Sequence, residues 1–269
     1  MSGRVEPTSR KAAGGSIGLT VAYDGRSFAG FARQPGLRTV QGALEDALRT
    51  ALRREVETTG AGRTDAGVHA LGQVVSFEAA GPDLPEGTLV RSLNALSGDG
   101  IVVRGLRHAR PGFSARFDAI SREYRYRLAV GDIAPLFLAP FAWRVRGHLD
   151  GDAMRAAALH LIGEHDFRSF CVAESADGHR TFRRVETVEV LEEEQLGEEC
   201  TVVRVVGNAF LHSMVRTIVG TLVEVGAGRR DPVWVADALA ACDRSAAGPT
   251  APAHGLTLWS VEYPDEVWL

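Results

Sequence analysis

Hydrophobic and polar positions alternate along Ile17–Tyr23, which is typical of a β-strand that buries one of its faces. A turn follows at Asp24-Gly25. From Val40 to Leu52, apolar residues recur at helical spacing and predict a helix, with Thr39 as its N-cap. The next residues predict two strands, a helix and a strand, at Val56–Thr59, Gln73–Phe77, Gly87–Leu96 and Ile101–His108 in turn.

A second round of similar elements follows without a linker rich in proline, glycine or serine. This absence favours a duplicated α+β unit over two independent domains. We expect a disordered tail over residues 1–15, an N-terminal half over 16–115 and a C-terminal half over 116–269, with the seam between Phe113 and Val130. The second round comprises a strand at Glu123–Val130, a helix at Asp152–Ile162, strands at Thr181–Leu191 and Thr201–Val206, helices at Leu211–Val225 and Asp231–Ala241, and a strand at Leu256–Glu262. Within it, His165-Asp166-Phe167 is interpreted as a helix exit with a core phenylalanine.

Composition adds the environment in which these elements fold. The chain has 269 residues, of which 45% are hydrophobic and 24% charged, as in ordinary globular proteins. No apolar run is long enough for a membrane span, and no signal peptide is recognisable, so we expect a cytoplasmic protein. The three cysteines, Cys171, Cys200 and Cys242, are far apart and odd in number, which favours reduced thiols.

The net charge of −4 argues against a nucleic-acid partner, but the charges are unevenly distributed. Residues 101–127 contain seven arginines and two acids, whereas residues 185–199 contain seven glutamates and no basic residue. Such segregation can give an acidic protein one positive face.

A glycine-rich segment at residues 59–70 places Asp65 between two predicted strands. Such turns often display a reactive side chain, and we expect the neighbouring Arg63 to keep the carboxylate ionised. Phosphate binding by the glycines is disfavoured, because neither a Gly-Lys-Ser/Thr motif nor a Gly-x-Gly-x-x-Gly motif leading into a helix is present. A purely turn-forming role for Asp65 remains an alternative.

Further residues stand out from their surroundings. In the strand predicted around Arg122-Glu123-Tyr124-Arg125-Tyr126, we expect both tyrosines on one face and the arginines on the other; for either tyrosine a core role is the alternative. Arg216 lies early in an apolar helix, where a charge needs a partner; Asp237 and Glu224 are candidates within the same part of the chain. His69 and His212 have no metal-binding neighbours at suitable spacing, so we expect structural roles for them and no metal site.

The segment GAGRTDAGVHA at residues 60–70 closely resembles the signature of the tRNA pseudouridine synthase A family. One departure is Phe31-Ala32, where the family has a Trp-Gln-Arg-Gln segment. Further stretches match in the family's order: VAYDGRSFAGFARQ (21–34), GQVVSFE (72–78), SLNAL (92–96), FSARFDAISREYRYRL (113–128), GEHDFRSF (163–170), NAFLHSMVRTIVGTLVEVG (208–226) and GLTLWSVEYP (255–264).

This resemblance implies the pseudouridine synthase fold, in which two similar halves share a central mixed or antiparallel sheet with helices outside and a cleft across it. It also implies isomerisation of uridine to pseudouridine in the anticodon stem-loop of tRNA, by a homodimer without cofactor or metal. Asp65 would be the catalytic carboxylate and Arg216 its partner. Tyr124 would contact the flipped uracil, and Arg63 would fill the gap that the base leaves. The RNA-contacting segment would be Phe113, Ser114, Ala115, Arg116 and Phe117, with Arg116 on a phosphate.

Two other functions compete with isomerisation. A noncatalytic RNA-binding or RNA-folding protein could use the same basic cleft, although it would not need Asp65, Arg63, Tyr124 and Arg216 together. A hydrolytic N-glycosidase also uses a carboxylate, but it would need a second acid or base, and the segment around Asp65 has none.

Overall fold

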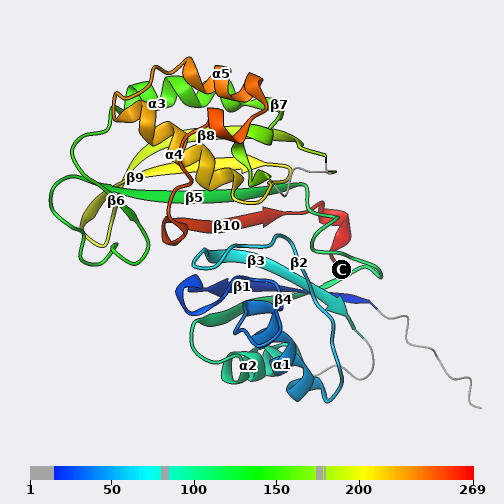
Figure 1. The fold of residues 1–269 in the computed structure, drawn as a ribbon. Coiled ribbons are helices and arrows are strands. Elements are labelled where there is room, and N and C mark those ends of the chain that lie inside the picture. The colour runs from blue at the N-terminus through cyan, green and yellow to red at the C-terminus, as the bar shows by residue number, and fades with distance from the viewer. Residues whose placement is uncertain (1–14, 80–84, 174–177, 179) are drawn as a thin grey trace, which may run out of the picture.

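The computed structural model describes residues 15–79, 85–173, 178 and 180–269. Of the tail expected over residues 1–15, only Gly15 belongs to the described residues. Ten strands form one sheet whose main path runs β4-β1-β3-β10-β5-β9-β8-β7, with β2 paired to β3 and β6 paired to β5. Helices cover the two ends of this sheet separately (Figure 1). The chain is therefore an α+β protein built on one central sheet.

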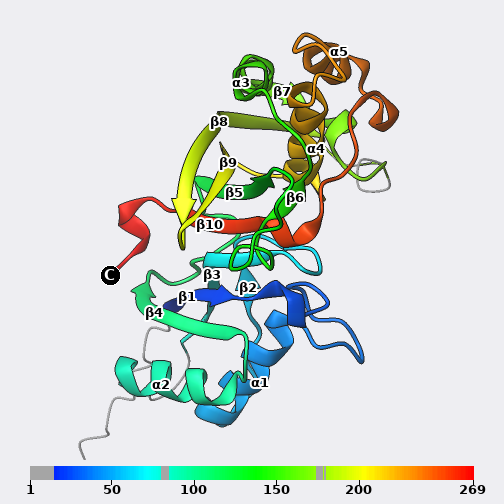
Figure 2. The ribbon, with the colours of Figure 1, turned by 90° about the vertical axis from the view of Figure 1, so that its left-hand side faces the viewer.

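The N-terminal half contains the strands up to Ala109. β1 (Ser16–Tyr23) lies between β3 (His69–Glu78) and β4 (Ile101–Ala109) and pairs with both in antiparallel fashion, while β2 (Thr59–Gly60) adds a short pairing to β3. Helices α1 (Val40–Leu52) and α2 (Glu86–Leu96) cover this end of the sheet (Figure 2). As predicted, Thr39 is the N-cap of α1, and its hydroxyl accepts a hydrogen bond from the amide of Gly42.

The C-terminal half begins with β5. Its helices lie together at the other end of the sheet (Figure 1). The expected boundary at residue 115 falls in the connection between β4 and β5. The strands are β5 (Ser121–Val130), β6 (Trp143–Val145), β7 (Gly163–Asp166), β8 (Phe182–Gln195), β9 (Glu198–Gly207) and β10 (Leu256–Glu262), and the helices are α3 (Gly151–Ala158), α4 (Met214–Gly226) and α5 (Trp234–Ala241).

The two halves join where β10 lies between β3 and β5. β10 pairs with β5 in antiparallel fashion and with β3 in parallel fashion, the latter through Thr257 opposite His69 and Leu258 opposite Ala70. Since β5 and β6 are also parallel while the remaining pairs are antiparallel, the sheet is mixed, as the resemblance implied. The remaining strands of the two halves lie on opposite sides of this contact (Figure 2).

Several element boundaries differ from the sequence-based prediction. The hairpin of β8 and β9 is longer than expected, because Leu196 and Gly197 both adopt left-handed conformations and form a tight two-residue turn. His165 and Asp166 belong to β7 and not to a helix exit, although Phe167 is fully buried as expected. Of the strand predicted at Val56–Thr59, only Thr59 lies in a strand, and β6 was not predicted.

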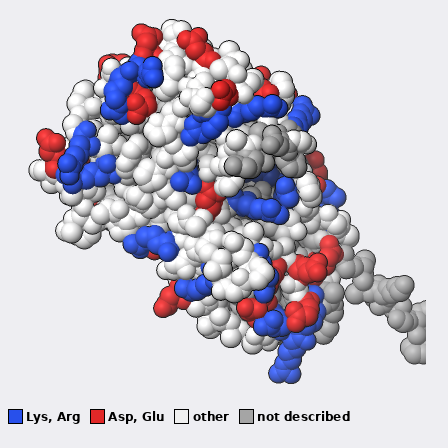
Figure 3. Space-filling model, viewed as in Figure 1, with Lys and Arg blue, Asp and Glu red and all other residues white. Residues whose placement is uncertain are grey.

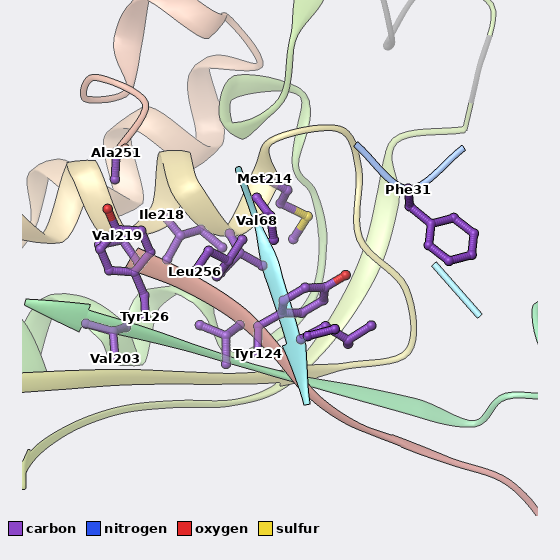
Figure 4. Packing of buried hydrophobic residues seen from close by; sticks show 14 of the residues in the cluster. Phe31, Val68, Tyr124, Tyr126, Val203, Met214, Ile218, Val219, Ala251 and Leu256 are labelled. Atoms are coloured by element: carbon purple, nitrogen blue, oxygen red, sulfur yellow. The ribbon is translucent and has the colours of Figure 1, made fainter. Parts of the chain in front are cut away.

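Helix α4 lies against β5 and contributes a large part of the C-terminal core. Tyr124 and Tyr126 extend from β5 toward the same side as α4 (Figure 4). Tyr126 is fully buried and donates a hydrogen bond to the carbonyl of Pro252 at 2.8 Å, which confirms its core role. Eleven of the thirteen residues of α4 are buried; the exceptions are Arg216 and Glu224. This helix is therefore fixed by packing on most of its circumference.

The backbone of α4 lies close to the backbone at Pro249. A Cβ atom at Gly220 would overlap the carbonyl group of Pro249. At Gly226 of the same helix, the nearest obstacle would be the side chain of Met154, which is flexible.

We therefore expect Gly220→Ala to lower the free energy of unfolding by about 2–3 kcal/mol, since backbone cannot move aside as a side chain can. The matched substitution Gly226→Ala should cost less than about 1 kcal/mol. Urea unfolding of both variants tests this difference, and equal losses would contradict the backbone clash as its cause.

Candidate active site

A cleft of about 890 Å³ lies between the two halves. It is lined by the start of α4, the residues after β9, part of β5 and the segment between β2 and β3 (residues 61–68), here called the Asp65 loop. Basic side chains border the hollow on this face of the molecule (Figure 3). Among the described residues that line it, Asp65 is the single carboxylate and five are arginines: Arg63, Arg116, Arg122, Arg183 and Arg216.

The Asp65 loop is held at both ends by backbone hydrogen bonds. The amide of Val68 donates to the Asp65 carbonyl at 3.1 Å, which closes a turn that Gly67 completes with a φ of +81°. The amide of Phe31 donates to the Thr64 carbonyl at 3.0 Å, so a second segment clamps the loop from the side. These bonds fix the backbone on both sides of the carboxylate.

A buried polar network supports the same loop from below. The Tyr23 hydroxyl and the Thr64 hydroxyl are 2.8 Å apart, and the Gln73 amide donates to the Gly62 carbonyl at 2.9 Å and to the Tyr23 oxygen at 3.4 Å. Burial raises the pKa of Tyr23 to about 12, so its phenol stays protonated and can act as a donor at neutral pH. The residue before Asp65 is thereby anchored in the core of the N-terminal half.

The Asp65 carboxylate receives its partners from the other half of the chain. Nη1 of Arg216 lies 2.7 Å from Oδ2, and the Ser213 hydroxyl donates to Oδ2 at 3.0 Å. Nε2 of His212 lies 3.3 Å from Oδ1. In the described part of the chain, Arg63 forms no ion pair with Asp65. The expectation that Arg63 is the cation beside the carboxylate is therefore wrong, because Arg216 takes this place. Arg63 is exposed at the cleft.

Arg216 is itself held from two sides. Its Nε donates to the carbonyl of Ala251 at 2.8 Å, and the Ala251 amide donates back to the Arg216 carbonyl at 3.1 Å. Of the alternative partners in the sequence, Glu224 pairs with Arg229 at 2.7 Å. The Arg216 side chain is 19% exposed and faces the cleft. The ion pair implied by the resemblance is thus present in the structure.

Tyr124 borders the cleft with little of its surface exposed. The side chain is 7% exposed and meets the ring of Phe210 edge to face, with 5.1 Å between the centroids. Burial raises the pKa of its phenol well above the ordinary value. Within the described residues, no protein group is hydrogen-bonded to its hydroxyl. A neutral donor therefore remains available to a group that enters the cleft.

Arg122 lies on the same face of β5 as Tyr124, which corrects the expectation that all arginines of this strand lie opposite the tyrosines. The error was one of period, since residues two apart share a face. Its guanidinium donates to four carbonyls, those of Ala61, Arg116, Ala119 and Asn208, at 2.6 to 3.1 Å. Burial lowers the pKa of Arg122. This buried cation thereby ties the Asp65 loop to two other segments that border the cleft.

The segment predicted to contact RNA divides into core and surface residues. Phe113 is 4% exposed and packs against Tyr263 and Trp268, and Ala115 is fully buried, so neither side chain reaches the cleft. Ser114 is partly buried, and its amide donates to Asp118. Arg116 and Phe117 do line the cleft, and the Phe117 ring is 80% exposed.

Sequence reasoning missed His212 and Ser213 as parts of the site. The helix was predicted to begin at Leu211, whereas α4 begins at Met214 because Ser213 takes a left-handed conformation with a φ of 59°. A serine directly before an apolar helix could have marked the true start. His69 is buried, and its Nδ1 accepts a hydrogen bond from the Gly25 amide. Its structural role stays a prediction. The described residues contain no group of three metal-binding side chains.

The departure at Phe31-Ala32 concerns packing around the Asp65 loop. Phe31 is 2% exposed, and its ring lies directly against Gly60. The phenylalanine therefore supports the loop from the core of the N-terminal half.

No helix in the described part of the chain is both long and apolar enough to cross a membrane.

Comparison with known proteins places these features in a family. The family profile described as tRNA pseudouridine synthase matches residues 19–118 and 157–264. The chain is 47% identical over 243 residues to tRNA pseudouridine synthase A of Brevibacillus brevis, covering 90% of this chain and 97% of that protein. The protein of the same name from Frankia casuarinae is 47% identical over 252 residues, covering 92% and 89%, and that of Bacillus subtilis is 42% identical over 248 residues, covering 91% and 97%. The chain therefore belongs to the tRNA pseudouridine synthase family.

Proposed function

We propose that the protein isomerises uridine to pseudouridine in the anticodon stem-loop of tRNA, with Asp65 as the catalytic carboxylate. The observation that supports this most directly is the position of Asp65, which among the described residues is the single carboxylate beside five arginines in a cleft of about 890 Å³. The reaction breaks the bond from C1′ to N1 and rejoins the base through C5, after which C5 loses its proton and N1 carries one. A positioned carboxylate serves it, either by stabilising charge at the sugar carbon or by removing a sugar proton.

The base reaches this carboxylate only outside the helical stack, because the glycosidic carbon is shielded within a stem. Tyr124 supports such a flipped state, since its side chain borders the cleft beside the Asp65 loop and its hydroxyl has no hydrogen bond to the described residues. Because burial raises the pKa of Tyr124, its phenol is neutral, can donate a hydrogen bond and can stack against the flipped base. Arg63 is exposed at the same cleft and is the proposed substitute for the base in the stack.

Arg116 and Phe117 form the proposed RNA contact next to the flipped base. Arg116 supplies a cation for a phosphate, and the exposed Phe117 ring offers a stacking surface for an adjacent base. The guanidinium of Arg116 lies 5.3 Å from the Phe117 ring centroid, so both groups approach the RNA together. The proposal includes neither a cofactor nor a metal, and it takes the cytoplasm as the place of the reaction.

A noncatalytic RNA-binding protein is the competing function. The hydrogen bonds to Asp65 from Ser213 and Arg216 count against it, because a carboxylate repels phosphate and binding alone would not need one held in place. Incubation with unmodified tRNA distinguishes the functions, since isomerisation yields pseudouridine, hydrolysis releases uracil and simple binding leaves the RNA unchanged.

Replacement of Asp65 tests the catalytic assignment. We expect Asp65→Asn to abolish pseudouridine formation while the Kd for tRNA stays within about tenfold, because arginine contacts to phosphate supply most of the affinity. Glu224→Gln is the matched control: it removes a carboxylate on α4 that pairs with Arg229 away from the cleft. Appreciable turnover by Asp65→Asn would refute the catalytic role.

The two cleft arginines should respond differently to replacement. Arg216→Ala removes a partly buried cation that is hydrogen-bonded to Asp65 and Ala251, so we expect about 2 kcal/mol lower stability and a large loss of the isomerisation rate. Arg63→Ala should leave stability within about 1 kcal/mol, because the side chain is exposed, yet slow the single-turnover rate at least about tenfold through impaired base flipping.

Melting temperature and single-turnover rate, measured together, give the two patterns. Arg49→Ala is the control for a general charge effect, since Arg49 is exposed on α1 outside the cleft. If Arg216→Ala has the melting temperature and the rate of the parent protein, the contact with Asp65 contributes to neither, and the proposed role of Arg216 is wrong.

We further propose that two copies form a homodimer that binds one tRNA. The family resemblance supports this, and so does a group of exposed apolar side chains between β5 and β6, namely Ile133, Leu136 and Phe137. Light scattering should give about twice the chain mass of 28.8 kDa. A monomer with full activity at nanomolar concentration would contradict the dimer.

A further inference from the structure

The two oxygens of the Asp65 carboxylate have unequal environments. Oδ2 accepts from both the Ser213 hydroxyl at 3.0 Å and Nη1 of Arg216 at 2.7 Å. Oδ1 has, among the described residues, only the longer contact of 3.3 Å to Nε2 of His212, whose side chain is 53% exposed. One oxygen is therefore held by two donors, while the other has a single, longer contact.

Ser213 does not behave as a serine before a helix usually does. At this position a hydroxyl normally accepts a hydrogen bond from an amide in the first turn of its own helix. The Ser213 side chain makes no such bond to α4 and instead reaches Asp65, 148 residues earlier in the chain. Helix capping therefore does not explain the orientation of the Ser213 side chain.

The backbone of Ser213 points to the same conclusion. Its φ of 59° and ψ of 10° lie in the left-handed region, where a residue with a Cβ atom is strained. Glycine would adopt this conformation without strain, but it would lack the hydroxyl. Strain of this kind persists where the surrounding structure enforces it, often at functional sites.

We propose that Ser213 is a positioning residue which, together with Arg216, holds Oδ2 of Asp65 and leaves Oδ1 to meet the ribose of the flipped uridine. The inference rests on the function proposed above and adds the oxygen that faces the substrate. Ser213 and Arg216 lie three positions apart at the start of α4, so both donors move with one helix. Since α4 is packed over most of its surface, the carboxylate is oriented before RNA binds.

The decisive variant is Ser213→Gly, which removes the hydroxyl and relieves the backbone strain at once. At saturating tRNA, we expect its single-turnover rate to fall about tenfold, as for the loss of one hydrogen bond to a charged group. The Kd for tRNA should stay within about threefold, because the hydroxyl contacts Asp65 and not RNA. The melting temperature should be equal to or above that of the parent protein.

Two further variants separate the hydroxyl from the backbone. Ser213→Ala should lose as much rate as Ser213→Gly but melt at a lower temperature, since alanine stays strained in the left-handed region. Leu196→Gly relieves the same strain in the β8–β9 turn. Leu196 is 73% exposed and does not line the cleft, so this variant should keep the parental rate.

Two outcomes would overturn the inference. A Ser213→Gly variant with the parental rate would show that the hydroxyl does not position Asp65, and a rate loss matched by an equal loss of tRNA affinity would make Ser213 an RNA contact. If the parent protein itself forms no pseudouridine, the proposed function fails instead. The parental assay thus distinguishes the two failures.

Discussion

The ion pair of Asp65 and Arg216 is the contact on which the arrangement of the cleft depends, because it connects residues 151 positions apart from the two halves of the chain. Both side chains are largely withdrawn from solvent, with exposed fractions of 24% and 19%, so desolvation offsets much of their attraction. The pair therefore positions the Asp65 carboxylate and adds little to the stability of the fold. Neutral groups hold the two side chains in place: the Ala251 carbonyl accepts a hydrogen bond from Arg216, and the Tyr23 hydroxyl contacts the hydroxyl of Thr64 in the Asp65 loop.

The charge distribution reconciles an acidic chain with a partner that carries phosphates. Glutamates of β8 are engaged on the sheet itself, as Glu189 is with Arg204 and Glu193 with Arg125. At the cleft, by contrast, Arg122 is bound to carbonyl groups, which leave its charge uncompensated. A net charge of −4 is thus compatible with a positive cleft, because attraction of RNA depends on the local field.

The sequence predicted elements whose pattern is local and missed those set by tertiary contacts. Strict periodicity defined α1, with its Thr39 cap, and β4 almost to the residue. The start of α4 was placed three residues early, because the left-handed Ser213 is stabilised by a contact with the other half, which no local pattern contains. The same limit applies to the site: family resemblance named Asp65 and Arg216, whereas the residues alone gave Arg216 two other possible partners, Asp237 and Glu224, and left His212 with a structural role.

The place of β10 in the sheet has a consequence for synthesis. This strand follows the other nine in sequence, yet it lies between β3 and β5 in the interior of the sheet. Until it leaves the ribosome, a growing chain carries two open strand edges, which are templates for unwanted pairing with other chains. Leu256, which borders the cleft, is the first residue of this strand, so the cleft is also completed only then. The order of synthesis therefore keeps a nascent chain from presenting a finished cleft to RNA before its sheet is closed.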